Sequence, residues 1–421
     1  MEKLKVGIFG VGRGTGIGKN FQMADCEIVA ICDTNATHIK YAREAFGEDI
    51  TVYGKFDEFI NHDMDAVVLT NSFHEHAPYA IKCFEKGLHV YSECISNATM
   101  AEGVELVRAF QKSNVVYMLA ENYPQMKHNI EMRRLVKGGT LGKILYAEGE
   151  YNHPGPNNDV PGMREISYFE KHWRNYCPRT YYITHSLGPV MRITGATPKK
   201  VVAFASFAPP PDGPDAISAS YNGDRVGVVT TQNDDGSVFR VTGCAAFGGG
   251  HHNFTRICGT DGQVENFRGS LGQKLLLRYD PHTKPAGKAR ETIYEPEWED
   301  QDEDLIAQSG HGGGDFITVR MFVNAIKEGK QPEHPFDIYS AVAMSSVAIL
   351  GHRSVLAGGK TFDIPDFRKE EDCKLYENDR LTPFWSFDRT EPPTLPCCSH
   401  TDYKPSEAML KNYREKVDGC K

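Results

Sequence analysis

Residues 6–18 read Val-Gly-Ile-Phe-Gly-Val-Gly-Arg-Gly-Thr-Gly-Ile-Gly, an apolar run that leads into a turn where every second residue is glycine. A second apolar run, Glu-Ile-Val-Ala-Ile-Cys-Asp at 27–33, follows after a stretch long enough for one helix. A strand, a glycine-rich turn, a helix and another strand make a βαβ unit, whose two strands are parallel. This stretch therefore predicts the fold of the chain around it.

The alternation of strand and helix continues to about residue 120. The further strands and helices are predicted, in chain order, at 66–70, 77–86, 88–92, 100–111 and 115–120. Strands that alternate with helices predict a parallel sheet covered on both faces, the doubly wound Rossmann arrangement. We therefore expect an N-terminal Rossmann domain over residues 1–122.

The glycine-rich turn is suited to a dinucleotide. Gly10 and Gly12 have the spacing of the dinucleotide fingerprint, whereas the third glycine comes one residue late, at Gly16. Glycines let backbone N–H groups approach a pyrophosphate, and the next helix adds its positive N-terminal end. Asp33 ends the second strand, where a carboxylate accepts hydrogen bonds from the adenosine ribose and repels a 2′-phosphate. These features predict NAD rather than NADP.

The rest of the cofactor site is predicted from the sheet. Ligands of doubly wound sheets bind beyond the carboxyl ends of the strands, so the residues that follow each strand are candidates. Several of these residues are polar or titratable. The predicted cofactor-binding residues are Gly10, Gly12, Arg13, Gly14, Thr15, Gly16, Asp33, Thr70, Asn71, His74, His76, Glu93, Cys94, Glu121 and Asn122.

The second half of the chain has a different pattern. From about residue 148 to 363, strands predominate over helices, which is typical of an α+β domain with an open, mainly antiparallel sheet. We expect this domain, for substrate binding and oligomerisation, over 123–365. Residues 366–421 contain prolines, aromatics and charges without a period, which predicts an extended tail. The predicted fold class is therefore α/β, a Rossmann domain followed by an α+β domain.

Composition limits the partners. Lys and Arg total 47 against 56 for Asp and Glu, a net charge of −9 without a basic block, which argues against nucleic acid or an anionic membrane. No apolar run approaches the roughly 18 residues that span a bilayer, and the N-terminus lacks the pattern of a secretory signal. Eleven scattered cysteines are typical of reduced thiols. We expect a cytoplasmic protein with a small-molecule partner.

Several motifs in order resemble the Gfo/Idh/MocA family of nicotinamide-dependent sugar oxidoreductases. They are Asp33, His74-Glu-His76-Ala-Pro, Gly87-Leu-His-Val-Tyr-Ser-Glu93 and the segment 138–150. The resemblance implies a carbohydrate substrate, NAD and a homo-oligomer, a dimer or tetramer, formed through the open face of the second sheet. Dehydrogenases of that family have a Glu-Lys-Pro segment whose lysine contacts the cofactor ribose and the reacting hydroxyl. Here the segment is Glu93-Cys94-Ile95, so that cation is missing.

Two segments of the second half resemble the glycoside hydrolase family 109 branch, NAD-dependent α-N-acetylgalactosaminidases that also lack the lysine. They are Tyr151-Asn-His153 and Tyr182-Ile-Thr-His185. Where that branch carries an active-site tyrosine, this chain has Phe254, so the same substrate is not assumed. The resemblance implies cleavage of a glycoside by transient oxidation of C3, elimination, addition of water and return of the hydride.

Local geometry groups the candidate catalytic residues in pairs. On a strand, Tyr151 and His153 share a face, and in a first helical turn Tyr182 and His185 lie together. Imidazole titrates near neutrality, and a phenol can be tuned to carry a proton. We predict that His185 takes the proton of the sugar hydroxyl with Tyr182 beside it, and that Tyr151 and His153 serve the elimination.

Other functions remain open from the sequence alone. One is a net sugar or glycoside dehydrogenase that forms a 3-keto product, and another is a noncatalytic regulator that binds NAD or a sugar. A third is a metal-assisted keto-glycoside lyase, although no local metal-binding spacing is present and no metal ligand is predicted. Its candidate ligands are Glu121, Glu150, His153, His185, His251 and His252. In the segment 310–315, Asp315 is expected to cap the next helix and His311 is a candidate substrate contact.

Overall fold

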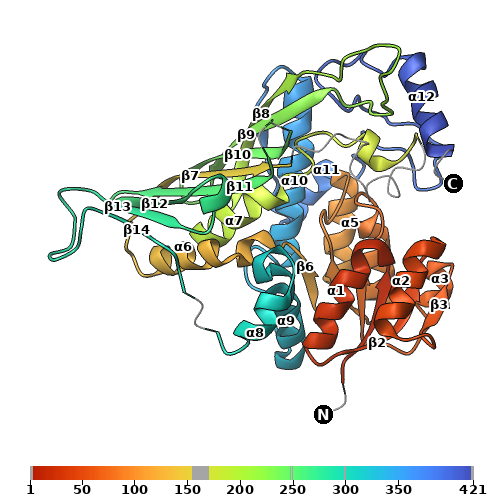
Figure 1. Ribbon diagram of the computed structural model, residues 1–421, viewed down its shortest axis with the longest axis horizontal. Coiled ribbons are helices and arrows are strands. Elements are labelled where there is room, and N and C mark those ends of the chain that lie inside the picture. The colour runs from red at the N-terminus through yellow and green to blue at the C-terminus, as the bar shows by residue number, and fades with distance from the viewer. Residues whose placement is uncertain (1–2, 154–169, 247, 249, 298–299, 419–421) are drawn as a thin grey trace.

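The computed structural model describes residues 3–153, 170–246, 248, 250–297 and 300–418, which form two sheets with helices around them (Figure 1). The first sheet has six strands in the order β3-β2-β1-β4-β5-β6, and every pairing is parallel. Its elements are β1 (Lys5–Phe9), α1 (Val11–Met23), β2 (Glu27–Cys32), α2 (Ala36–Phe46), β3 (Thr51–Tyr53), α3 (Phe56–Phe59), β4 (Ala66–Leu69), α4 (His76–Glu85), β5 (His89–Ser92), α5 (Met100–Phe110) and β6 (Tyr117–Leu119). The predicted Rossmann sheet is confirmed.

Sequence signals explain most of these elements. The four residues of β4, Ala-Val-Val-Leu, are all buried, as expected of a central parallel strand covered on both faces. Asn35 caps α2, and Thr99 with Glu102 forms a capping box at the start of α5. The three-residue edge strand β3 was not predicted, because so short a segment carries no hydrophobic period.

The second sheet has nine strands in the order β14-β13-β12-β11-β7-β10-β9-β8-β15. All of its pairings are antiparallel except that of β7 with β10, so the predicted mainly antiparallel sheet is confirmed. Its strands are β7 (Ile144–Asn152), β8 (Pro198–Phe207), β9 (Asp224–Asn233), β10 (Val238–Ala245), β11 (His252–Gly259), β12 (Gly262–Asn266), β13 (Leu275–Tyr279), β14 (Glu291–Tyr294) and β15 (Phe362–Asp363).

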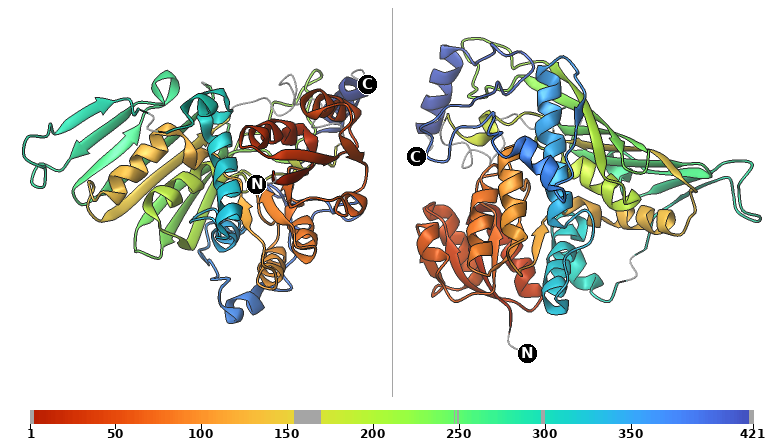
Figure 2. Two further views of the ribbon diagram at one scale, coloured as in Figure 1. Left: turned by 90° about the horizontal axis from the view of Figure 1, so that it is seen from below. Right: turned by 180° about the vertical axis from the view of Figure 1, so that it is seen from behind.

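Helices cover one face of the second sheet and leave the other open (Figure 2). Helices α6 and α7 lie along the covered face, and α10 stands between the two sheets, against β8 on one side and α5 on the other. None of the described helices is long and apolar enough to cross a membrane. The helices of this half are α6 (Lys127–Lys137), α7 (Thr184–Thr194), α8 (Glu303–Gln308), α9 (Gly314–Glu328), α10 (Ile338–Leu356), α11 (Glu370–Tyr376) and α12 (Glu407–Asp418), with short 3-10 turns η1 (Tyr123–Gln125), η3 (Trp173–Asn175), η4 (Gly269–Leu271) and η5 (His311–Gly313).

Late segments of the chain complete the first sheet. Helix α9 packs against α1, and its Val319 and Phe322 are buried in the same core cluster as Ile8 of β1. The segment after residue 365 contains α11 and α12 and is therefore less extended than predicted. Within it, Phe384 is buried, its ring stacked on His74 at a centroid distance of 4.7 Å. The C-terminal segment thus covers the residues that follow β4.

Close packing of α1 on β1 explains part of the glycine repeat. A Cβ at Gly14 would lie 2.5 Å from Cγ2 of Ile8 and 2.6 Å from Oγ1 of Thr70. At Gly16 the nearest atom is Nη1 of Arg13, at 3.8 Å. Gly14 therefore serves the contact between helix and sheet, whereas Gly16 has room for a side chain.

We expect Gly14→Ala to lower the free energy of unfolding by about 1–3 kcal/mol, because the added methyl overpacks the helix against Ile8. The matched control, Gly16→Ala, is expected to be neutral or to stabilise by up to about 1 kcal/mol, because alanine favours the helix. Urea unfolding of both variants measures the difference. Equal stability of Gly14→Ala and the wild type would contradict this account.

Candidate active site

The glycine-rich turn lies against the end of β4. Gly10 has a φ of +90°, and a side chain there would place its Cβ 2.5 Å from the carbonyl oxygen of Thr70. The Thr70 hydroxyl donates to the Gly10 carbonyl at 2.6 Å. Only glycine combines this backbone conformation with so close an approach. The contact fixes the turn at the start of α1, whose positive end is available to an anion.

Asp33 is held rigidly at the end of β2. One carboxylate oxygen accepts from the Val11 N–H at 2.8 Å, and the other accepts from the N–H groups of Thr34 and Asn35 at 2.7 and 2.8 Å. Among the described residues, His38 is the only basic side chain within 4 Å of this carboxylate. The position offers hydrogen-bond acceptors to a ribose diol and no Lys or Arg partner to a 2′-phosphate.

The segment after β4 divides into an unpaired amide and two packed histidines. Both side-chain polar atoms of Asn71 are buried and lack a hydrogen-bond partner, so they are available to a ligand. His76 is buried at the start of α4, where its Nδ1 lies 2.9 Å from the Ile95 carbonyl oxygen. His74 stacks on Phe384, and burial lowers its pKa to about 3. Burial lowers the pKa of both imidazoles, which are therefore neutral near pH 7, and one nitrogen of each, Nδ1 of His74 and Nε2 of His76, is buried without a hydrogen-bond partner.

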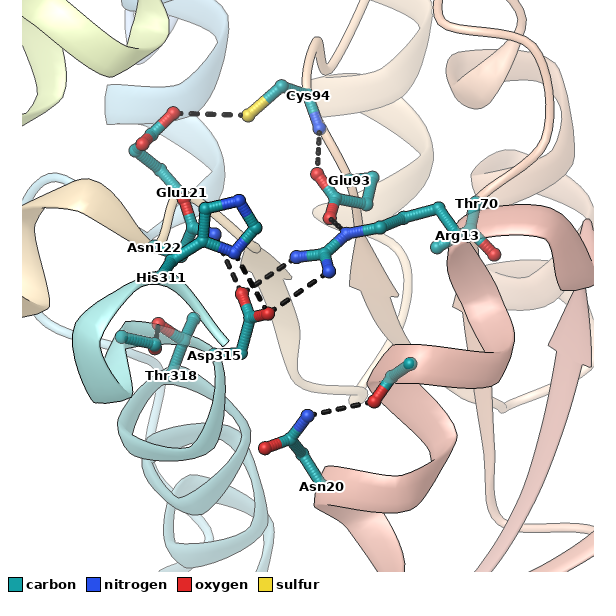
Figure 3. A network of polar contacts seen from close by, with 12 residues as sticks. Arg13, Asn20, Thr70, Glu93, Cys94, Glu121, Asn122, His311, Asp315 and Thr318 are labelled. Carbon is teal, nitrogen blue, oxygen red and sulfur yellow. Dashed lines mark hydrogen bonds and ion pairs between the residues drawn. The ribbon is translucent and has the colours of Figure 1, made fainter. Parts of the chain in front are cut away.

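A network of polar contacts joins the two halves of the molecule (Figure 3). The Arg13 guanidinium donates to both oxygens of Asp315, at 3.0 and 2.7 Å, and to Glu93 at 3.2 Å. Asn122 donates to Asp315 at 2.7 Å, and Nδ1 of His311 lies 3.0 Å from the same carboxylate. The network connects the glycine-rich turn, the ends of β5 and β6, and the first turn of α9.

The predicted helix cap at Asp315 is wrong. Helix α9 begins at Gly314 with Gly313 as its N-cap, and the hydroxyl of Ser309 accepts from the Phe316 N–H at 2.9 Å. Asp315 instead turns toward Arg13, because its side chain is only 3% exposed and a buried carboxylate requires charged or polar donors. Asp315 therefore joins the first turn of α9 to the glycine-rich turn and does not cap the helix.

A buried carboxylate supports the predicted catalytic histidine. Glu121 follows β6 and is 0% exposed, and its two oxygens lie 2.8 and 3.0 Å from Nδ1 of His185 in the first turn of α7. Its Oε1 also accepts from the Tyr123 N–H at 3.1 Å, and the Cys94 thiol donates to Oε2 at 3.2 Å. Burial would raise the pKa of Glu121, but His185 and the other donors lower it below its ordinary value.

The carboxylate of Glu121 determines which nitrogen of His185 carries a proton, and it helps to keep the thiol of Cys94 protonated. The ionised Glu121 keeps a proton on Nδ1 of His185 and leaves Nε2 to act as a base. Burial and the carboxylates Glu121 and Glu93 raise the pKa of Cys94 well above its ordinary value, so its thiol stays neutral. Cys94 therefore supplies a hydrogen bond to Glu121 and no charge.

Aromatic and imidazole rings gather around His185. The centroids of Tyr123, Tyr151 and Tyr182 lie 4.3, 4.8 and 5.3 Å from that of His185. The predicted pairing of Tyr151 with His153 is also seen, with centroids 5.9 Å apart and nearly parallel rings. The structure thus brings all four predicted catalytic residues into one cluster.

His251 extends this cluster. Its ring centroid lies 5.1 Å from that of His153 and 5.5 Å from that of Tyr151. Burial, His251 and Arg174 lower the pKa of His153, and burial with His185 lowers that of His251. Neutral imidazoles therefore predominate here near pH 7, which suits the removal of protons from a substrate.

Other candidate residues lie on the opposite face of the sheet. Glu150 pairs with His252 at 2.6 Å and with Arg268 at 3.0 Å. Phe254 is in register with Glu150 and carries the Arg268 guanidinium over its ring at 3.7 Å. The family resemblance placed Phe254 in the site. The structure places it on the other face of the sheet, outside the cluster around Tyr151.

The candidate metal ligands are divided by this arrangement. Glu150 and His252 lie on one face of the second sheet, and His153 and His185 belong to the cluster on the other. Within the described part of the chain, no group of three or more His, Cys, Asp or Glu side chains is placed to hold a metal ion.

Known families match both halves of the chain. Residues 4–121 match an oxidoreductase family with an NAD-binding Rossmann fold, and residues 126–373 match the C-terminal domain of glycosyl hydrolase 109. The second match alone spans more than half of the chain. The chain belongs to the glycosyl hydrolase 109 family. It is an NAD-dependent enzyme of a carbohydrate-active family, and the Rossmann match agrees with the predicted cofactor.

Relatives match this family 109 chain over most of its length. A glycosyl hydrolase family 109 protein of Stenotrophomonas maltophilia (strain K279a) is 24% identical over 412 residues, which cover 87% of this chain and 89% of the relative. An alpha-N-acetylgalactosaminidase of Shewanella oneidensis is 23% identical over 405 residues, covering 88% and 86%. A solved levoglucosan dehydrogenase in complex with NADH and L-sorbose has a TM-score of 0.71 and 19% identity, covering 87% of this chain and 100% of that one. The structural likeness shows a shared fold.

Sequence reasoning missed how the family 109 site is held together. Glu121 was predicted to bind the cofactor, and its contact with His185 was not foreseen. Tyr123 was not singled out, although it follows Glu121 directly after β6, where ligands of such sheets bind. The pairing of Arg13 with Asp315 has no local signal, because 302 residues separate the partners.

We expect Glu121→Gln to lower the free energy of unfolding by about 1–3 kcal/mol at pH 7, because a neutral amide replaces the carboxylate that accepts the Nδ1–H of His185 in a charge-assisted hydrogen bond. The lowered pKa of Glu121 means that the wild type gains this stability above the unfolded pKa and loses it as pH falls through the folded pKa. The difference between the two proteins should therefore shrink below about pH 4.

Urea unfolding between pH 3 and pH 8 measures this difference. Glu148→Gln is the matched control, because that carboxylate accepts from the Tyr146 hydroxyl on the open face and pairs with no histidine. We expect its effect to stay within about 1 kcal/mol at each pH. A Glu121→Gln protein as stable as the wild type at pH 7 would disprove the role of the pair.

Proposed function

We propose that this enzyme cleaves a glycosidic bond by transient oxidation of the sugar at C3. The observation that carries the proposal is the Glu121–His185 pair, set among three tyrosines at the carboxyl edge of the Rossmann sheet. A base at this edge lies where a sugar hydroxyl would be held next to a nicotinamide. The family 109 relatives, one of them named an alpha-N-acetylgalactosaminidase, support a glycoside as the substrate.

The residues of the first domain fit NAD. The turn from Gly10 to Gly16 and the N-terminus of α1 would hold the pyrophosphate, and Asp33 would hold the adenosine ribose. The unpaired amide of Asn71 and the unpaired Oδ1 of Asn122 would contact the nicotinamide half. When bound, NAD accepts a hydride from the sugar and returns it at the end of the cycle.

The catalytic roles follow from the contacts in the cluster. Nε2 of His185 takes the proton of the C3 hydroxyl, because Glu121 keeps Nδ1 protonated. Tyr182 lies beside it and orients the same hydroxyl. Tyr151 and the neutral His153 remove the C2 proton that the C3 ketone acidifies. Loss of the C1 substituent, addition of water and reduction of C3 complete a reaction without net redox change.

A conventional glycosidase mechanism is poorly supported here. Such enzymes place two carboxyl groups on either side of the scissile bond, one as acid and one as nucleophile or base. At this site Glu121 is fully buried beneath His185, and Asp315 is bound to Arg13, Asn122 and His311. Both carboxylates are engaged with protein donors, so imidazoles and phenols are left to transfer protons.

We expect the wild type to release the aglycone from an aryl glycoside in deuterated water, with deuterium at C2 of the sugar and without accumulation of NADH. His185→Gln should lower the rate of release by about 10²–10⁴-fold, because the sugar hydroxyl loses its base. His282→Gln, in the exposed turn between β13 and β14, is the control and should leave the rate unchanged.

The same assay distinguishes the alternatives. Stoichiometric NADH without aglycone would identify a net sugar dehydrogenase, and a dependence on added divalent metal would identify a metal-assisted lyase. If NAD binds but no sugar or anomer of a panel gives aglycone, deuterium at C2 or NADH, the protein would be a regulator. Any of these three results overturns the proposal.

We further propose that the open face of the second sheet joins copies of the chain in a dimer or tetramer. Phe204 of β8 is 62% exposed on this face, directly opposite the exposed Val228 of β9, and Val238 of β10 is also exposed. Adjacent exposed apolar side chains on a sheet are typical of a protein interface. The face is continuous across the central strands and is not covered by the described helices.

Light scattering coupled to gel filtration should therefore give at least twice the monomer mass of 47.0 kDa. Phe204→Lys is expected to shift the protein toward the monomer, because a desolvated ammonium disfavours the contact. Leu375→Lys, on the exposed face of α11, is the control and should leave the mass unchanged. A monomeric wild type would contradict the proposal.

Cellular placement follows from the cysteines. The nine whose side chains the structure describes are free, and most of them are buried. Buried free thiols suit a reducing compartment. We therefore propose the cytoplasm as the site of action.

A further inference from the structure

His311 has the same kind of carboxylate partner as His185. Its Nδ1 lies 3.0 Å from Oδ2 of Asp315, as Nδ1 of His185 lies 2.8 Å from Glu121. Both imidazole rings neighbour Tyr123, with centroid distances of 4.3 Å for His185 and 5.9 Å for His311. The site therefore contains two carboxylate-held histidines, and the mechanism above uses one of them.

The partner of His311 is fixed in place. Asp315 is 3% exposed and is bound by two nitrogens of Arg13 and by Asn122 (Figure 3). Burial would raise the pKa of Asp315, but His311 and Arg13 hold it well below its usual range, so the carboxylate stays ionised. An ionised partner on Nδ1 leaves Nε2 as the atom that gains and loses a proton.

The loop presents the His311 side chain outward. Its φ is +54°, and Gly312 and Gly313 continue the left-handed turn at +62° and +92°. A side chain in this conformation is unfavourable by about 1 kcal/mol, so its presence here requires a compensating contact. The His311 side chain is 39% exposed, against 11% for His185. The imidazole of His311 is accordingly more exposed than that of His185.

The groups facing His311 come from four elements. Asp315 belongs to α9, Tyr123 to η1, and Arg13, which binds the same carboxylate, to α1. His251 lies just before β11, and the charge of His311 contributes to lowering its pKa. Only Asp315 carries a negative charge among these. Asp315 therefore holds Nδ1 of His311, and Nε2 is left to exchange a proton with a substrate.

We propose that His311 is a catalytic residue, the acid that protonates the leaving oxygen and then the base that activates water. This inference rests on the proposed glycoside cleavage, in which the removal of the C3 and C2 protons is assigned but the donor to the leaving oxygen is not. His311 is a partly exposed imidazole beside the cluster, and an imidazole has the chemistry to donate and accept this proton.

The proton balance of the two steps is complete. In the elimination, the C2–H bond breaks as its proton passes to the base at Tyr151 and His153, the C1–C2 double bond forms, and the C1–O bond breaks. The Nε2 proton of His311 goes to the departing oxygen, which leaves as a neutral alcohol. In the addition, water bonds to C1 and gives its proton to Nε2 of His311, while C2 regains a proton. The histidine ends in its starting state.

The test compares leaving groups in His311→Gln and the wild type. A 2,4-dinitrophenyl glycoside departs without an acid, whereas a methyl glycoside requires one. We expect His311→Gln to keep its single-turnover rate of aglycone release from the dinitrophenyl glycoside within about threefold, and to lose about 10²–10⁴-fold on the methyl glycoside. His282→Gln, an exposed histidine in the turn between β13 and β14, is the control and should match the wild type on both substrates.

A second readout applies if an earlier step limits the overall rate. In deuterated water, the ratio of C2 exchange in recovered methyl glycoside to methanol release should rise at least tenfold in His311→Gln, because the oxidised intermediate returns when it cannot eliminate. Equal losses on the two substrates with an unchanged exchange ratio would overturn the role of His311, as would no loss on either. A wild type that cleaves no glycoside while binding NAD refutes the proposed function instead.

Discussion

The hydrogen-bonded pair of Glu121 and His185 is the contact on which the site depends. The carboxylate comes from the end of a strand in the first sheet and the imidazole from a helix that lies on the second. A fully buried carboxylate is tolerated only when opposite charge and hydrogen bonds surround it, so the two sheets must meet in one relative position. That position also brings Tyr123, Tyr151 and Tyr182 around the imidazole. The order of the site is thus a consequence of satisfying one charge.

Asp315 is a second buried carboxylate that is held by opposite charge and hydrogen bonds. It binds Arg13 from the glycine-rich turn and His311 from its own loop, and so connects that turn to the loop beside Tyr123. Each carboxylate is thereby converted from a reactive group into a support for an imidazole. A fold shared with sugar dehydrogenases can in this way carry several proton carriers without an exposed carboxylate or lysine.

Local patterns were sufficient to predict much of this structure. The alternation of strands and helices gave five strands of the first sheet, and strand and helix periods placed Tyr151 with His153 and Tyr182 with His185. Contacts between distant segments were not predictable, because nothing near Arg13 indicates a partner 302 residues away.

The face of the sheet on which Phe254 lies could also not be predicted from the sequence. Its side chain belongs to one face or the other according to how β11 pairs with β7, and a shift of one residue in that pairing exchanges the faces. Resemblance to a family motif aligns residues along the chain and does not determine this register. His311 is a similar case, since its orientation depends on a left-handed backbone that only the folded loop reveals.

The packing of α9 and Phe384 has a consequence for biosynthesis. The first 120 residues emerge early from the ribosome, yet Val319 and Phe322 from the last quarter of the chain fill the core beside β1, and Phe384 covers His74. A nascent Rossmann half therefore exposes apolar surface until these later segments have been synthesised. During that interval its uncovered core is open to binding by chaperones and to aggregation.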